Sequence, residues 1–214
     1  MEELLHKLSR DQWLTTGEYI ELLEVPLYRE AQALADRVRR ERFGTQVYLR
    51  GLIDVGSICQ YHCPHCHQRS GADCVRYRMR PREILDCCEE AEALGVRNLL
   101  LRSGPDRFYT DKMLTGLVAK IRAHYPRFAI GLAMGERSRR ALTDLADAGA
   151  DRYTLLHETA DRDQFRRTHP AELSHDRRLH CLNELKDSGF QTACGFLVGR
   201  KDKGLSLCDG QKGA

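Results

Sequence analysis

Hydrophobic and polar residues follow two different periods along the chain, and the change of period marks where strands are expected. Apolar residues near a period of 3.6 are typical of amphipathic helices, whereas short runs of β-branched and apolar residues are typical of buried strands. The first part of the chain predicts two helices, over residues 15–25 and 26–44. The first has capping-box spacing between Thr15 and Glu18, and the second stops at Gly44, a favourable residue after a helix.

From Gln46 onward, apolar segments alternate with amphipathic ones. Helices are expected over residues 81–95, 111–125, 138–149 and 174–189, and strands over 46–56, 96–104, 127–135, 151–158 and 190–199. Alternation of this kind is typical of a parallel sheet with right-handed crossovers, either doubly wound or a TIM-like barrel. Five strands do not close a barrel of eight.

These patterns predict an α/β fold with three parts. Residues 1–45 are expected to form a helical extension, and residues 46–199 a partial TIM-like (βα) barrel. Residues 200–214 are polar and glycine-rich without periodicity, which predicts a disordered tail.

Composition and charge exclude several classes of protein. The chain has 214 residues, of which 42% are hydrophobic and 30% charged, with a net charge of +3. This balance is ordinary for a globular protein and too weakly basic to indicate nucleic acid or a membrane surface. No apolar run is long enough for a transmembrane helix, and the polar start does not resemble a signal peptide. We therefore expect a cytoplasmic protein with no membrane or nucleic-acid partner.

The stretch SICQYHCPHCHQRSG carries the most distinctive chemistry. It holds three of the nine cysteines, Cys59, Cys63 and Cys66, directly after the first expected strand. A structural zinc ion would need a fourth ligand, and candidates are His62, His65, His67 and Cys74, but no second close pair follows at the usual spacing. An iron–sulfur cluster is the alternative, because three thiolates hold three irons of a cubane and leave the fourth open. Active sites of βα folds gather where strands end, which favours the cluster.

The spacing C-x3-C-x2-C after strand one resembles the radical S-adenosylmethionine (SAM) superfamily. Within it, several segments resemble the HydE-type maturases of FeFe-hydrogenase, a family close to methylornithine synthase and biotin synthase: VYLRGLIDVGSIC, LLLRSGPD, GLAMGERS, GADRYTLLHETA and GFLVG. That family has a full barrel, so the chain is interpreted as truncated after its fifth strand. The resemblance implies a 4Fe-4S cluster that reduces SAM to a 5′-deoxyadenosyl radical during maturation of the hydrogenase active-site cluster. It also implies an electron donor, hydrogenase maturation proteins as partners, and a small-molecule or organometallic substrate.

The resemblance assigns roles to individual residues. The cluster ligands would be Cys59, Cys63 and Cys66; the SAM contacts would be Ser103 and Gly104 at its methionine end, Glu158, and Arg178 facing its carboxylate. A carboxylate accepts hydrogen bonds from ribose hydroxyls or an amine, and the arginine fork suits a carboxylate. A solvated pair at the strand ends is the alternative for Glu158 and Arg178.

Four departures from the family pattern bear on activity. His65 stands where an aromatic residue is usual, His67 where glycine is usual, and Pro105 where glutamate is usual. Leu156 stands where an arginine is frequent, and the strand period of two predicts that it points into the barrel with Glu158. Leucine cannot anchor an anionic substrate. Two alternatives therefore remain: an amino-acid mutase or biotin-synthase-like radical enzyme, and a non-catalytic, truncated metal-binding domain.

Overall fold

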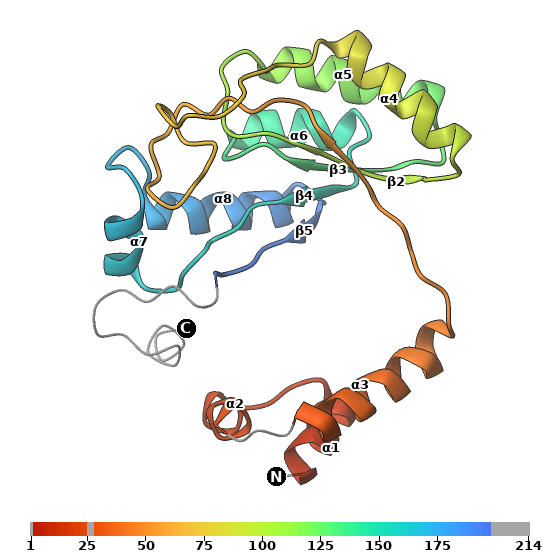
Figure 1. Cartoon of the computed structure of the whole chain (residues 1–214), viewed down its shortest axis with the longest axis vertical. Helices are drawn as coiled ribbons and strands as arrows, with labels where there is room; N and C mark the ends of the chain where they lie inside the picture. Colours follow the sequence, from red (N-terminus) through yellow and green to blue (C-terminus); the bar gives the residue numbers. More distant parts are fainter. Residues whose placement is uncertain (1, 25–27, 198–214) are drawn as a thin grey trace. The chain divides into compact units, whose positions relative to one another are not determined.

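The computed structural model describes residues 2–24 and 28–197 and divides the chain into two compact units (Figure 1). The first unit extends to Tyr48, and the second begins at Leu49. The tail predicted over residues 200–214 lies outside the described residues. Among those that are described, no helix is long and apolar enough to cross a membrane.

The first unit contains three described helices rather than the two that were predicted. They are α1 (Glu2–Asp11), α2 (Thr16–Leu23) and α3 (Tyr28–Phe43). The predicted capping box is confirmed, because the Thr15 side chain accepts from the Glu18 amide while the Glu18 carboxylate accepts from the Thr15 amide. Lys7 of α1 donates to Glu18 at 2.5 Å and so joins α1 to α2. The helix α1 was missed, although Leu4, Leu5 and Leu8 have helical spacing.

The second unit is built on one parallel sheet of five described strands. They are β1 (Gly51–Asp54), β2 (Asn98–Arg102), β3 (Ala129–Ala133), β4 (Arg152–Thr154) and β5 (Gln191–Ala193). Their spatial order is β1-β2-β3-β4-β5, and each neighbouring pair is parallel. A doubly wound sheet reverses its strand order at one point, whereas a (βα) barrel adds strands in sequence. The order therefore confirms the predicted partial barrel.

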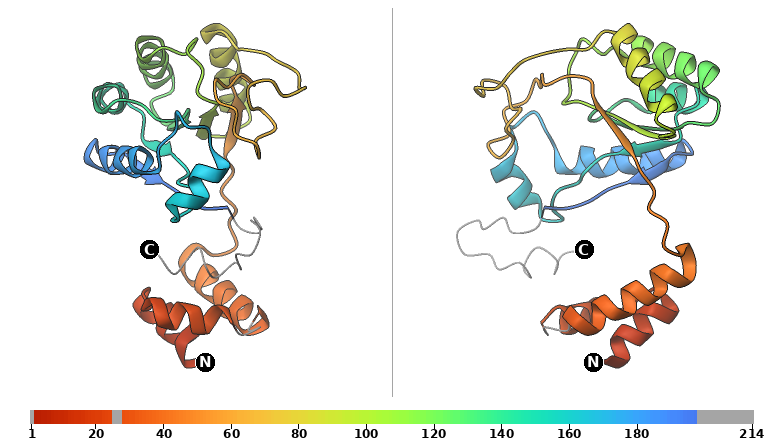
Figure 2. Two further views of the ribbon diagram at one scale, coloured as in Figure 1. Left: turned by 90° about the vertical axis from the view of Figure 1, so that its left-hand side faces the viewer. Right: turned by 45° about the vertical axis from the view of Figure 1, so that its right-hand side comes forward.

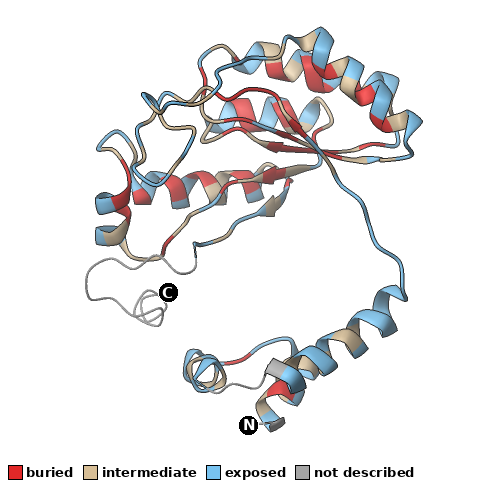
Figure 3. Ribbon diagram, in the orientation of Figure 1, coloured by how far each residue is buried: buried red, intermediate tan, exposed pale blue. Residues whose placement is uncertain are grey.

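Helices cover one side of this sheet, as the two views of Figure 2 show. They are α4 (Pro81–Ala93), α5 (Asp111–His124), α6 (Arg139–Asp147) and α8 (His175–Asp187). Buried apolar residues gather between these helices and the sheet (Figure 3), with Ile84, Ile121, Ile130 and Leu142 fully buried. Burial of this kind is the main stabilising contribution, at about 25 cal/mol for each Å² of apolar surface removed from water.

Two expectations about these elements were wrong in detail. The strand expected to begin at Gln46 begins at Gly51, where its pairing with Leu99 of β2 starts. Val47 and Tyr48 are 82% and 73% exposed, and none of the described strands pairs with this strand-like segment. A short helix, α7 (Arg162–Thr168), was not predicted. It begins at the Asp161 cap, shortly after β4 ends.

Candidate functional site

The cysteines lie in a long connection, residues 55–80, that joins β1 to α4. The two ends of this connection are paired with each other. Gly56 and Arg78 form an antiparallel bridge, and the Met79 amide donates to the Val55 carbonyl at 2.7 Å. The buried Tyr109 hydroxyl lies between the two ends and contacts both the Val55 and Met79 carbonyls. The connection is therefore closed at its base, where it leaves β1 and enters α4.

Arg76 organises the interior of this connection, which has little apolar material of its own. Its guanidinium donates to the carbonyls of Ser57, Gln68, Arg69 and Ala72 at 2.6–3.0 Å. The guanidinium thus satisfies backbone acceptors at both the beginning and the middle of the connection. Sequence reasoning gave this residue no role, because its partners are backbone atoms that carry no sequence signal.

The three thiols share one environment, and none is in a disulfide. Cys59, Cys63 and Cys66 are all partly buried. Burial, the Glu158 carboxylate and the thiols of Cys59 and Cys66 raise the pKa of Cys63 to about 11. The Tyr61 amide donates to the Cys59 sulfur at 3.4 Å, a contact of the kind that tunes cluster thiolates. Three thiols that interact electrostatically with one another, with an amide directed at one of them, are a donor set that suits a 4Fe-4S cluster with one open iron.

A structural zinc ion at the three cysteines finds less support, because three of the residues considered as its fourth ligand make other contacts. His62 uses its Nδ1 for a 2.6 Å contact with the Ser70 carbonyl, and His65 faces Glu158 rather than a cysteine. Cys74 is partly buried, and the Cys74 amide donates to the Ala72 carbonyl at 3.1 Å in a turn of its own.

The end of β2 supports the cysteine loop directly. A Cβ atom placed on Gly104 would lie 2.7 Å from the Cβ of Cys59 and 3.1 Å from its sulfur. Ser103 is buried and donates to the Gly104 carbonyl at 2.8 Å, and the Gln60 amide donates to the Pro105 carbonyl at 3.0 Å. The sequence analysis gave Ser103 and Gly104 a contact with SAM. The structure adds a second requirement, because only glycine lets this turn approach Cys59 so closely.

Glu158 lies beyond β4 in an unusual backbone conformation. Its φ of 67° is in the left-handed region, which costs a non-glycine residue of the order of 1 kcal/mol or more. The Glu158 amide donates to the Gly195 carbonyl, and its own carbonyl accepts from the Leu197 amide, both at 2.9 Å. Because β4 ends at Thr154, the strand period that predicted a common direction for Leu156 and Glu158 does not extend to Glu158. Leu156 itself is 43% exposed.

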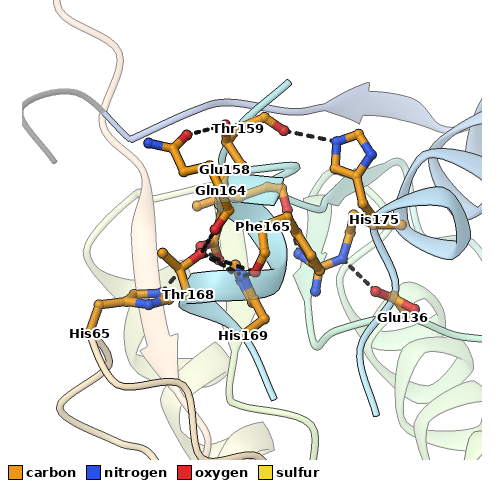
Figure 4. A network of polar contacts seen from close by, with 11 residues as sticks. His65, Glu136, Glu158, Thr159, Gln164, Phe165, Thr168, His169 and His175 are labelled. Carbon is orange, nitrogen blue, oxygen red and sulfur yellow. Dashed lines mark hydrogen bonds and ion pairs between the residues drawn. The ribbon is translucent and has the colours of Figure 1, made fainter. Parts of the chain in front are cut away.

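Two histidines contact the Glu158 carboxylate (Figure 4). Its Oε2 atom lies 3.2 Å from Nε2 of His65 and 3.0 Å from Nε2 of His169. Burial alone would raise the pKa of Glu158, but His169, His65 and Arg178 hold it below the ordinary value. The Glu158 side chain is therefore a partly buried carboxylate that is surrounded by groups that favour its charged form. The sequence analysis did not associate His169 with Glu158, because the two residues share no short motif.

Arg178 is buried near the start of α8 and is held by several contacts. Its guanidinium donates to the Glu136 carboxylate at 2.5 Å and to the Leu156 carbonyl at 2.6 Å. It also lies over the Phe165 ring, 5.6 Å from the ring centroid. Glu136 follows β3, so this pair joins the ends of β3 and β4 to α8. The site residues predicted from sequence thus gather where the parallel strands end.

A cavity of about 300 Å³ lies beside the cysteine loop at the same edge of the sheet. Gln60, Pro105, Glu136 and Arg137 are among its lining residues. Its size is at the lower end of the range for small-molecule sites, and its lining is mostly polar. Arg137 donates to Asp111 at 2.7 Å across this region.

Comparisons with known proteins agree with this geometry. The family model of the radical SAM superfamily matches residues 53–203. The chain is 32% identical to the [FeFe] hydrogenase maturase subunit HydE of Thermotoga maritima, over 92% of this chain and 57% of that protein. It is 27% identical to biotin synthase of Cutibacterium acnes, over 78% of this chain and 48% of that protein. The fold matches the crystal structure of methylornithine synthase with a TM-score of 0.85 and 22% identity, covering 98% of this chain and 62% of that one. The chain spans about half of the length of the curated relatives it matches.

Proposed function

Because the chain belongs to the radical SAM superfamily, we propose that Cys59, Cys63 and Cys66 hold a 4Fe-4S cluster and that the neighbouring strand ends bind SAM. Members of this superfamily use that cluster and that cofactor. The observation that carries the proposal is the position of the three partly buried thiols, on a closed loop after β1 at the active edge of a parallel sheet.

The cluster, when bound, supplies the electron that cleaves SAM to methionine and a 5′-deoxyadenosyl radical. The protein's part is to bind, orient and shield the reacting groups. Glu158 offers a carboxylate whose lowered pKa keeps it charged, which suits ribose hydroxyls or a cationic amine. Arg178 is ion-paired with Glu136 and donates to the Leu156 carbonyl. These contacts place its guanidinium at the ends of β3 and β4, where it would face the SAM carboxylate.

The role of the whole protein is proposed from its relatives. Identity of 32% to a hydrogenase maturase over 92% of the chain supports a part in assembling the FeFe-hydrogenase active-site cluster, in the cytoplasm. Such a part requires an electron donor, the other maturation proteins and a small-molecule or organometallic substrate. Leu156 favours a substrate that is not anchored through an anionic group at this position. Amino-acid radical chemistry like that of methylornithine synthase is a second candidate, supported by the shared fold.

Anaerobic reconstitution with iron and sulfide tests the proposal. We expect about four irons per chain, broad visible absorbance, and release of 5′-deoxyadenosine from SAM when dithionite is added. Cys63→Ala should lose both the cluster and SAM cleavage. Cys74→Ala is the matched control, because it removes a partly buried thiol of the same loop that the proposal does not use. One bound zinc per chain with no SAM cleavage would show instead a non-catalytic metal-binding domain.

A further inference from the structure

We propose that His65, Glu158 and His169 form a second metal site, for a divalent first-row transition ion such as Zn²⁺, and that an ion there competes with SAM for Glu158. The proposal of a metal site depends only on the positions of the three side chains. The competition rests on the function proposed above, since it requires Glu158 to contact SAM.

The three donor atoms already lie close to the separations that a metal ion requires. Nε2 of His65, Nε2 of His169 and a carboxylate oxygen of Glu158 all lie within 4.8 Å of one another. Both histidine contacts converge on the same oxygen, at 3.2 and 3.0 Å. Tetrahedral ligands with zinc bonds of about 2.0–2.1 Å are about 3.3 Å apart. The two separations between the histidine nitrogens and the carboxylate oxygen would therefore need to widen only slightly to admit an ion. Figure 4 shows the three side chains directed toward one point.

The surroundings of His169 orient it as a ligand. Its side chain is 1% exposed and its ring stacks on Phe165 with centroids 3.8 Å apart. Its Nδ1 lies 3.0 Å from the Phe165 carbonyl and 3.0 Å from the Thr168 hydroxyl, which itself contacts the Gln164 carbonyl. An Nδ1–H donated to a backbone carbonyl is the usual support of a metal-bound imidazole. In the tautomer with the proton on Nδ1, the lone pair of Nε2 is directed at a carboxylate oxygen of Glu158.

The 3.0 Å contact between Nε2 of His169 and the Glu158 carboxylate needs either a proton or a metal ion between the two atoms. The backbone of Glu158 is held in its left-handed conformation by contacts on both sides, with Gly195 and Leu197, so the carboxylate cannot easily turn away. Imidazole nitrogen with one carboxylate oxygen is a donor set that suits Zn²⁺ or Fe²⁺ rather than Mg²⁺ or Ca²⁺.

The site would join two separate parts of the unit. His65 belongs to the cysteine loop, one residue before the cluster ligand Cys66, and His169 follows α7. An ion bound there would hold the cysteine loop against the end of β4 and take the carboxylate proposed for SAM. The position thus allows a divalent ion to inhibit the enzyme without displacing its cluster.

Zinc binding can be measured without interference from the cluster thiols. We would titrate Zn²⁺ into the full-length triple variant Cys59→Ala, Cys63→Ala, Cys66→Ala, with folding checked by circular dichroism. We expect one tightly bound zinc, and at least a tenfold weaker affinity when His169→Gln or His65→Gln is added. His180→Gln, an exposed histidine of α8, is the matched control and should change nothing. X-ray absorption should show only nitrogen and oxygen ligands near 2.0 Å.

A sulfur shell near 2.3 Å, or an affinity unchanged by both histidine variants, would overturn the site. If the triple variant does not fold, the same comparison is made with Co²⁺ added to the cluster-loaded protein, where d–d absorption reports ligation and must be lost in His169→Gln. For the competition, saturating Zn²⁺ should raise the Kd of SAM at least tenfold in the cluster-loaded protein but not in its His169→Gln variant. An unchanged Kd would refute the competition. Zinc uptake without any SAM cleavage would instead refute the proposed function and leave the metal site standing.

Discussion

Replacing Gly104 by alanine tests whether the turn after β2 sets the position of Cys59, a proposed cluster ligand. The added methyl carbon would lie 2.7 Å from the Cβ of Cys59, whereas non-bonded carbons are normally about 3.5–4.0 Å apart. Relieving an overlap of about 1 Å between backbone-anchored atoms should cost about 1–3 kcal/mol. We expect the Cys59 segment to shift, so that the variant is less stable and binds less iron.

Urea unfolding and the iron content after anaerobic reconstitution measure these two effects. Gly116→Ala is the matched control, because a Cβ at this position of α5 meets nothing within 4 Å. That change should stabilise the protein by up to about 1 kcal/mol, since alanine favours a helix. If Gly104→Ala unfolds at the wild-type urea concentration and still binds about four irons, the close approach to Cys59 is not a structural requirement.

Three further predictions concern charged groups of the second unit. Arg122→Ala should lower the free energy of unfolding by about 2 kcal/mol in urea, because this side chain donates to three backbone carbonyls near β3 and β4. Glu136→Ala should cost about 3 kcal/mol in the same assay, because it leaves the buried Arg178 without its carboxylate. Burial would raise the pKa of Asp106, but the hydrogen bonds from the Arg78 side chain and the Phe108 amide hold that pKa below its ordinary value. The ionised Asp106 therefore stabilises the folded state above about pH 4, and this stabilisation is lost as the pH falls further. The free energy of unfolding should differ more between pH 3 and pH 6 in wild type than in Asp106→Asn.

For each of these three variants, one result would contradict the prediction. An Arg122→Ala variant with unchanged unfolding would mean that water replaces the arginine at those carbonyls. Equal stability of Glu136→Ala and wild type would mean that Arg178 is solvated rather than buried. An Asp106→Asn variant that loses stability with acid as steeply as wild type would assign the pH dependence to other carboxylates.

The order of strands and helices could be predicted from sequence because local signals mark each junction. Gly95, Gly149 and Gly189, predicted to end helices before a strand, all have positive φ. Ser138 and Ser174, with which two of the predicted helices begin, both accept hydrogen bonds from backbone amides as helix caps. Strand boundaries were less accurate, since a strand exists only where a neighbour pairs with it. The sequence before Gly51 has strand-like composition without such a neighbour.

The candidate site was predictable only where its residues share a short motif. The three cysteines lie within eight residues, and their spacing carries the chemical signal. His169 lies far along the chain from His65, so only the folded sheet brings them to one carboxylate. The left-handed backbone of Glu158 was equally hidden, because it depends on pairing with the segment after β5.

The closed base of the 55–80 connection has a consequence for how the protein acquires its cofactor. The pairing of Gly56 with Arg78 and the Tyr109 contacts hold the two ends together, while inside the loop polar contacts to Arg76 replace an apolar core. Such a segment opens as a local unit, at lower free energy than the sheet beneath it. In hydrogen exchange, amides of residues 57–76 should exchange well before those of β2 and β3. We therefore expect the scaffold to fold without metal, and a chain that loses the proposed cluster to stay folded and able to bind it again.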